Sequence, residues 1–194
     1  PCASQGPTQS PPSCDVENKT LQLFALTKAI NPKQIRIFYW NSMLDFSFYR
    51  AHARMVAMEA AGLPSFLRDK HGEIMQLCND GDVYCNVTTF DWTQPHVRAL
   101  WVEQVANITE TGFVDGIFAD HSAEIGVSIG GEMDKQGPNQ LCNGNGNGRR
   151  CYDFTDEFKK SFNSWHAWST RYSQDVLSKS TGGPVVLAFE VSLH

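Results

Sequence analysis

An apolar segment near the middle of the chain ends in two residues that could do chemistry. The segment reads Val-Asp-Gly-Ile-Phe-Ala-Asp-His and runs from Val114 to His121. Its apolar run predicts a short buried strand that carries Asp120 and His121 at its C-terminal end. In barrels of alternating strands and helices, the chemistry lies at that end of the strands. The segment therefore predicts a site built around Asp120, whereas Asp115, at the other end of the strand, is interpreted as structural.

The elements that would position this site alternate along the chain. Apolar periodicity and capping residues predict helices over residues 20–30, 47–61, 93–111 and 153–178, with Ser47 and Thr93 as caps. Runs of β-branched and aromatic residues predict strands over residues 35–40, 86–90, 114–120 and 185–189. This alternation indicates a parallel sheet with helical crossovers.

Four strands are too few to close an eight-stranded barrel. We therefore expect the α/β class and a (β/α)8 TIM-barrel-like fold that is incomplete in this chain and is completed by a longer sequence or by partner chains. Residues 1–19 are expected to form a Pro/Ser-rich tail stapled by a disulfide, and residues 20–194 the partial barrel domain. Residues 121–152 are predicted to form a long Cys-closed loop that contains a run of alternating Asn and Gly.

Composition and charge exclude several classes of partner. The chain has 194 residues, 41% of them apolar, which is enough for one domain with its own core. Its formal net charge of -5 and the lack of a Lys/Arg block argue against nucleic acid as a partner. No apolar run has the length of a membrane span. We expect no cofactor and no metal site, because the acidic residues near Asp134 and Asp153 lack the spacing of a calcium loop.

Cysteines and glycosylation sequons together indicate the extracellular space. The six cysteines fall into three close pairs, which favours Cys2–Cys14, Cys78–Cys85 and Cys142–Cys151 among the 15 possible connectivities. Zinc is disfavoured because no Cys-x-x-Cys motif occurs. Three Asn-x-Thr sequons begin at Asn18, Asn86 and Asn107, the last within a predicted helix. Paired cysteines with sequons predict a secreted, disulfide-bonded glycoprotein.

Several segments together resemble the poorly characterised glycoside-hydrolase-like (β/α)8 barrel proteins. These segments are Phe38-Tyr39-Trp40-Asn41-Ser42, Tyr49-Arg50-Ala51-His52, Leu67-Arg68-Asp69-Lys70-His71-Gly72, Asp91-Trp92-Thr93-Gln94-Pro95-His96-Val97-Arg98 and Val114-Asp115-Gly116-Ile117-Phe118-Ala119-Asp120. The resemblance covers residues 20–125 well. It implies that the strand over residues 114–120 is the fourth barrel strand and that Asp120 is the nucleophile. The acid/base partner in such barrels lies on a later strand, and Glu190, at the end of its predicted strand, is the substitute that this chain offers.

Carbohydrate is the ligand that this resemblance implies. Glycoside hydrolysis needs two carboxylates that flank the glycosidic bond. Trp40 and Trp92, with Tyr39, are aromatic residues that could stack on sugar rings. The polar residues that could bind sugar hydroxyls at strand ends are Asn41, Asp91 and His121. The leading hypothesis is a secreted glycoside hydrolase.

Two other functions stay open at this stage. One is a carbohydrate-binding barrel that has lost catalysis, and the other is a structural extracellular glycoprotein that assembles with other chains. Exposed sheet edges in an incomplete barrel would favour the structural alternative, because such edges must be paired or covered. Other notable side chains have ordinary interpretations. Asp45 could line the pocket or lie in the turn before the helix over residues 47–61, and the turn is favoured. Packing or surface positions are expected for His52 and His96, and core or helix-packing positions for Trp101, Trp165 and Trp168.

Overall fold

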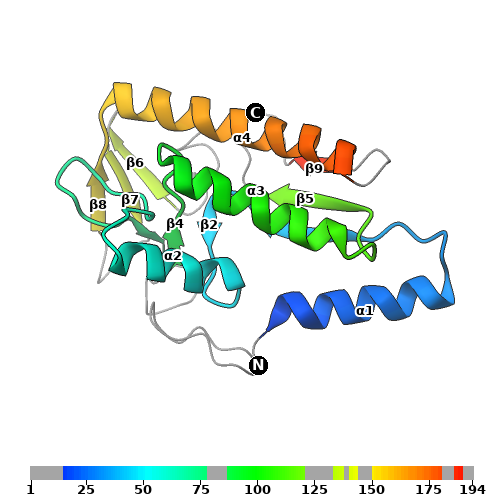
Figure 1. Ribbon diagram of the computed structural model, residues 1–194. Helices are drawn as coiled ribbons and strands as arrows, with labels where there is room; N and C mark the ends of the chain where they lie inside the picture. The colour runs from blue at the N-terminus through cyan, green and yellow to red at the C-terminus, as the bar shows by residue number, and fades with distance from the viewer. Residues whose placement is uncertain are drawn as a thin grey trace.

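The computed structural model describes residues 15–77, 87–120, 133–137, 140–143, 150–180 and 186–189. Four helices lie within these residues, and Figure 1 shows α3 and α4 running side by side. Their bounds are Val16–Ile30 for α1, Arg50–Ala60 for α2, Pro95–Glu110 for α3 and Asp156–Ser180 for α4. None of the described helices combines the length and apolar character that crossing a membrane requires.

The parallel sheet holds the strand that carries Asp120. It has the order β1-β5-β9, and its strands are β1 (Ile37–Asn41), β5 (Gly116–Asp120) and β9 (Val186–Phe189). Both neighbouring pairs are parallel, as the alternation of elements predicts. The register places Asn41 opposite Asp120. The C-terminal ends of β1 and β5 therefore lie side by side, which is the edge where the sequence predicts chemistry.

The predicted strand over residues 86–90 forms, but in a different sheet. Strand β4 (Val87–Thr89) pairs antiparallel with both β2 (Leu44–Asp45) and β3 (Gln76–Leu77), in the order β2-β4-β3. The prediction that it joins the parallel sheet is wrong. The described residues thus form a mixed α/β fold with three parallel strands, and they do not show a TIM barrel.

Part of the predicted loop over residues 121–152 is a third sheet. Strands β6 (Met133–Gly137), β7 (Gln140–Asn143) and β8 (Arg150–Asp153) pair antiparallel in the order β6-β7-β8. Cys142 and Cys151 are direct cross-strand partners in this sheet. Residues 144–149, with most of the Asn/Gly run, lie outside the described part.

Helix starts differ from the caps that the sequence predicts. Asp15 caps α1 by accepting a hydrogen bond from the backbone N–H of Asn18 at 2.9 Å, so this helix begins inside the predicted 1–19 tail. Helix α2 begins after Tyr49 rather than Ser47 and has no side-chain cap of its own. The buried carboxylate of Glu17 instead accepts the Arg50 N–H at 2.7 Å, which ties the start of α1 to the start of α2.

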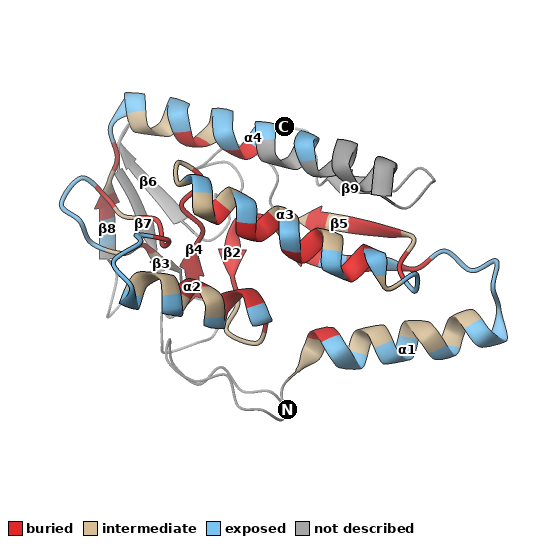
Figure 2. Ribbon diagram, in the orientation of Figure 1, coloured by how far each residue is buried: buried red, intermediate tan, exposed pale blue. Residues whose placement is uncertain are grey.

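The core lies between the helices and the sheets, and Figure 2 shows buried positions on α2, α3 and α4 and on β1, β2, β4 and β5. Helix α3 buries the face that its periodicity predicts, through Val97, Leu100, Trp101, Val105 and Ile108. Burial of each large apolar side chain contributes about 1.5–3 kcal/mol. The packing role predicted for Trp101 is confirmed.

Trp165 and Trp168 differ from Trp101, because their rings are 38% and 46% exposed on α4. The helix turns Phe162 and His166 toward the core instead. The Arg98 guanidinium lies 3.7 Å from the Trp165 ring centroid. These two tryptophans therefore lie on the surface of the helix pair rather than in the core.

Candidate functional site

Asp120 is held by two residues of the neighbouring strand β1. The Tyr39 hydroxyl donates a hydrogen bond to Asp120 Oδ2 at 2.5 Å, and the Asn41 amide donates to the Tyr39 hydroxyl oxygen at 3.2 Å. Tyr39 is 40% exposed and Asp120 is partly buried, so this side chain pair lies at the surface of the sheet edge. A phenol that donates to a carboxylate stabilises its ionised form. The arrangement fits a carboxylate that reacts as an anion.

The main chain at Asp120 is fixed by Ser42, the residue that follows β1. Both the backbone N–H and the hydroxyl of Ser42 donate to the Asp120 carbonyl oxygen, at 2.9 and 2.8 Å. His166 Nε2 of α4 lies 3.0 Å from the same hydroxyl oxygen. Ser42 and His166 are both buried. Asp120 is thus positioned through its carboxylate and through its backbone.

Asn41 contacts the partly exposed Tyr39 but does not itself reach the surface. It is buried, and its side-chain oxygen accepts the backbone N–H groups of Met43 and Leu44 at 2.9 and 2.6 Å. These bonds form the turn that takes the chain from β1 into β2. Together with the bond to Tyr39, these bonds make Asn41 a residue that positions the site. The Asn41 amide is buried in this structure, so it is not exposed to the sugar hydroxyl that the sequence predicts it to bind.

The two tryptophans predicted to stack on sugars lie in the core. Trp40 is 1% exposed and packs against Tyr49, with 4.5 Å between the ring centroids. Trp92 is fully buried, and its indole N–H donates to the Ser42 carbonyl at 2.9 Å. Both tryptophans therefore pack in the core, and neither exposes a ring face on which a sugar could stack. In the described residues, the partly exposed ring at this edge is Tyr39, which packs against Phe118.

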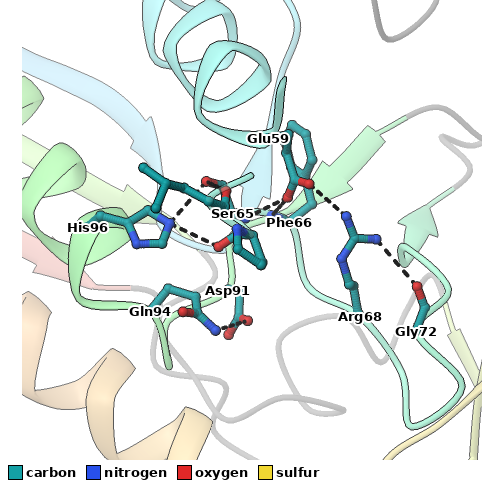
Figure 3. Close-up of polar contacts among 10 residues, drawn as sticks. Glu59, Ser65, Phe66, Arg68, Gly72, Asp91, Gln94 and His96 are labelled. Atoms are coloured by element: carbon teal, nitrogen blue, oxygen red, sulfur yellow. Dashed lines mark hydrogen bonds and ion pairs between the residues drawn. The ribbon is translucent and has the colours of Figure 1, made fainter. Parts of the chain in front are cut away.

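Asp91 shapes the start of α3. Its Oδ1 accepts the Thr93 N–H and hydroxyl at 3.0 and 2.6 Å, and its Oδ2 accepts the Gln94 amide at 3.1 Å, a contact drawn in Figure 3. The side chain is buried in this turn. The helix N-cap is Gln94, one residue after the predicted Thr93. The structure gives Asp91 a turn-forming role.

A neighbouring cluster organises the chain between α2 and β3, and Figure 3 shows its contacts. One Glu59 oxygen accepts the backbone N–H groups of Ser65 and Phe66, and the other pairs with Arg68 at 2.7 Å. Burial alone would raise the pKa of Glu59, but these hydrogen bonds and the Arg68 charge outweigh it and lower that pKa. His96 Nε2 lies 2.9 Å from the Pro64 carbonyl and 3.2 Å from the Ser65 hydroxyl.

A tight turn forms at residues 69–72 in this region. Asp69 Oδ1 accepts the N–H groups of His71 and Glu73, at 2.8 and 3.1 Å. Gly72 takes a φ of 83°, which favours glycine over other residues.

A second pairing of titratable groups lies in the core beside the site. Asp45 and His52 are 2% and 3% exposed, and Asp45 Oδ2 lies 2.6 Å from His52 Nδ1. The Thr88 hydroxyl donates to the same oxygen at 3.2 Å. The pair joins β2 to α2, and Asp45 lies in strand β2 rather than in the turn that the sequence favours for it.

Several predicted residues fall outside the described part of the chain. They are His121 and Glu190 of the site, Asn86 of the sequons, and Cys2, Cys14, Cys78 and Cys85. Asn18 and Asn107 are described and exposed, on α1 and α3. Cys151 is disulfide-bonded, and its pairing with Cys142 remains a prediction. Among the described side chains, no three His, Cys, Asp or Glu residues gather as a metal site would require.

Sequence reasoning missed three residues that hold Asp120. Tyr39 was considered only for stacking, although strand periodicity places it on the same side of β1 as Asn41 and thus near the partner strand's end. Ser42 and His166 gave no signal, because a serine after a strand and a histidine inside a helix are common. Their role depends on the packing of α4 against the sheet edge.

One family model matches residues 28–167, and its description is hypothetical glycosyl hydrolase family 15. The matched range covers most of the chain and includes Tyr39, Asp120 and His166. It ends before Glu190. A comparison with curated proteins gives no match.

Proposed function

Because this chain belongs to the hypothetical glycosyl hydrolase family 15, we propose that it is a secreted glycoside hydrolase with Asp120 as its reacting carboxylate. The observation that carries the proposal is the hydrogen bond from Tyr39 to Asp120 at the joint C-terminal end of two parallel strands. Active sites of α/β barrels lie at that end of the strands. The partial exposure of Tyr39 leaves this edge open to a ligand.

In the proposed reaction, an Asp120 oxygen attacks the anomeric carbon of a bound sugar as the glycosidic C–O bond breaks. A second carboxylic acid gives its proton to the departing oxygen, and Glu190 is the proposed donor. Water then forms a bond to the anomeric carbon, releases Asp120 and returns a proton to that second group. Water is the co-reactant, and the net result is hydrolysis of one glycosidic bond.

We also propose that the parallel sheet is part of a (β/α)8 barrel completed by strands outside the described residues. Burial alternates along β1, so that Phe38 and Trp40 are buried while Ile37 and Tyr39 are 37% and 40% exposed. Parallel sheets are normally covered on both faces. Mass measurement of the native, deglycosylated protein tests the contribution of further sequence: a mass well above 21.7 kDa with peptides past His194 is expected. A chain that ends near His194 would leave completion to partner chains.

Secretion and glycosylation are proposed on two observations. Asn18 and Asn107 are exposed on helices, where an attached glycan would meet solvent. Cys151 is disulfide-bonded, and such bonds persist in oxidising compartments. Enzymatic removal of N-glycans from protein secreted by eukaryotic cells should lower its mass, and an unchanged mass would contradict glycosylation.

The direct test is hydrolysis of a panel of α- and β-linked nitrophenyl glycosides and of natural polysaccharides. We expect the purified chain to release product from at least one of them and the Asp120→Asn variant to be about 10²–10⁴-fold slower. The matched control is Asp156→Asn, which makes the same change at an exposed position in the first turn of α4. Equal activity of the Asp120→Asn variant would remove Asp120 from the mechanism. Sugar binding without hydrolysis would favour the non-catalytic binding protein.

A further inference from the structure

We propose that His166 is a positioning residue for Asp120 and acts through the hydroxyl of Ser42. The catalytic part of this inference rests on the proposed hydrolase, whereas the hydrogen-bond chain is independent of any activity. Helix α4 lies beside α3, far along the chain from β1 (Figure 1). It nevertheless places His166 Nε2 3.0 Å from Ser42 Oγ, which is itself 2.8 Å from the Asp120 carbonyl.

The direction of each hydrogen bond follows from the groups involved. A carbonyl oxygen can only accept, so Ser42 must use its one hydroxyl hydrogen on Asp120. The Ser42 oxygen is then left to accept, and the hydrogen between it and His166 must be carried by Nε2. The chain of donors thus runs from His166 to Ser42 to the backbone of Asp120, and it fixes which ring nitrogen of His166 is protonated.

Buried aromatic rings surround His166, and a further hydrogen bond holds the Ser42 backbone. His166 is 2% exposed, and its ring lies 5.0 Å from Trp92 and 6.1 Å from Phe162, measured between ring centroids. The Trp92 indole N–H donates to the Ser42 carbonyl, so the serine is held at its hydroxyl and at its backbone. A polar ring in such a place is costly to bury unless it is hydrogen-bonded. The bond to Ser42 gives the Nε2 atom of His166 a partner and at the same time orients the hydroxyl that binds Asp120.

Loss of the His166 donor should release the Ser42 hydroxyl from its orientation and loosen the Asp120 backbone. A displacement of about 1 Å at a reacting group can slow a reaction about 10²-fold. We therefore expect His166→Phe, which keeps a ring in the pocket, to lower kcat roughly 10–100-fold with KM nearly unchanged. His166→Gln supplies an amide N–H near the position of Nε2 and should recover part of that loss.

The chain contains a matched control for this substitution. His96, in the first turn of α3, and Ser65, in the loop after α2, form the same kind of contact, Nε2 to Oγ at 3.2 Å, as Figure 3 shows. No hydrogen bond in the described residues joins either side chain to Asp120. His96→Phe and Ser65→Ala should therefore leave kcat unchanged, while Ser42→Ala should reproduce the effect of His166→Phe.

Nuclear magnetic resonance gives a readout that does not require activity. Asp120-His121 is the only Asp-His pair in the chain, so ¹³C′-aspartate with ¹⁵N-histidine labelling isolates the Asp120 carbonyl in one signal. We expect this signal to move in His166→Phe and Ser42→Ala and to stay in place in the His96 and Ser65 variants. The ¹⁵N spectrum of His166 should show a protonated Nε2.

The outcomes separate this inference from the proposed function. If the wild-type protein hydrolyses no glycoside, the hydrolase proposal fails, and the carbonyl signal alone decides the positioning role. If the Asp120 carbonyl signal is unchanged in folded His166→Phe, or if Nε2 of His166 is unprotonated, the inference is overturned. If His166→Phe does not fold, His166→Gln and Ser42→Ala test the same chain of hydrogen bonds.

Discussion

The buried pair of Asp45 and His52 allows a quantitative test of the structure. The two side chains are 0% and 4% exposed, and Asp45 Oδ2 lies 2.6 Å from His52 Nδ1. The Thr88 hydroxyl shares the same oxygen, whereas Asp45 Oδ1 has no hydrogen-bond partner among the described residues. The Asp45 carboxylate therefore depends on His52 for most of its stabilisation.

Removal of either residue should take the bond between Asp45 and His52 away from a partner that stays buried. We expect Asp45→Ala or His52→Ala to lower the free energy of unfolding by about 3–5 kcal/mol. That is a large share of the roughly 5–15 kcal/mol that stabilises an ordinary domain. The double variant should cost less than the sum of the two single variants, because the bond between Asp45 and His52 can be lost only once. A coupling energy of about 1–3 kcal/mol is expected.

The assay is urea unfolding of the wild type, the two single variants and the double variant at pH 7. Arg54 and Glu103 provide the matched control, because they form a two-bond ion pair whose side chains are 42% and 51% exposed. The same double-mutant cycle on Arg54 and Glu103 should give a coupling energy of about 0.2–1 kcal/mol. A coupling near zero at Asp45 and His52, or one no larger than the control, would refute the buried pair.

Three further predictions concern pH and the disulfide. Hydrogen bonds lower the pKa of Glu59 below its usual 4.5, so the unfolded chain binds protons more readily and this contribution to stability is lost as pH falls below about 4.5. Glu59→Gln should therefore cost about 1–3 kcal/mol at pH 7 by urea unfolding, with the difference shrinking in acid; a cost independent of pH would contradict this. Burial raises the pKa of Glu17 despite its hydrogen bond at the start of α2, so its ionisation destabilises the fold as pH rises above about 4.5. Glu17→Gln should equal or exceed wild-type stability at pH 7 and match it at pH 4, whereas a less stable variant at pH 7 would reverse the sign. Non-reducing peptide mapping should link the peptides of Cys142 and Cys151, which face each other across β7 and β8, and a link from Cys151 to another cysteine would disprove this pairing.

The amino-acid sequence by itself determined the elements that carry the site. Periodicity and turn residues located the four helices and the strands β1, β5 and β9 to within a few residues, because these signals depend on local backbone preferences and on one buried face. The apolar run before Asp120 placed that carboxylate at a strand end, where the structure has it. The family resemblance was likewise visible in the sequence, and the family match confirms it.

Tertiary structure decided which residues surround Asp120 and which only pack. Trp40, Trp92 and Tyr39 are all aromatic, yet among the three only Tyr39 is partly exposed, because burial depends on what packs around each position in the folded chain. The direction of β4 depends on pairing with β2 and β3, two short segments that have no strong pattern of their own.

The contact between His166 and Ser42 shows most clearly what local sequence patterns do not predict. The two residues are far apart in the chain, and each type is ordinary in its local setting. Their meeting depends on how α4 packs against the end of the parallel sheet. The sequence identifies a carboxylate at a strand end through local rules, whereas the partners that orient it are chosen by long-range packing.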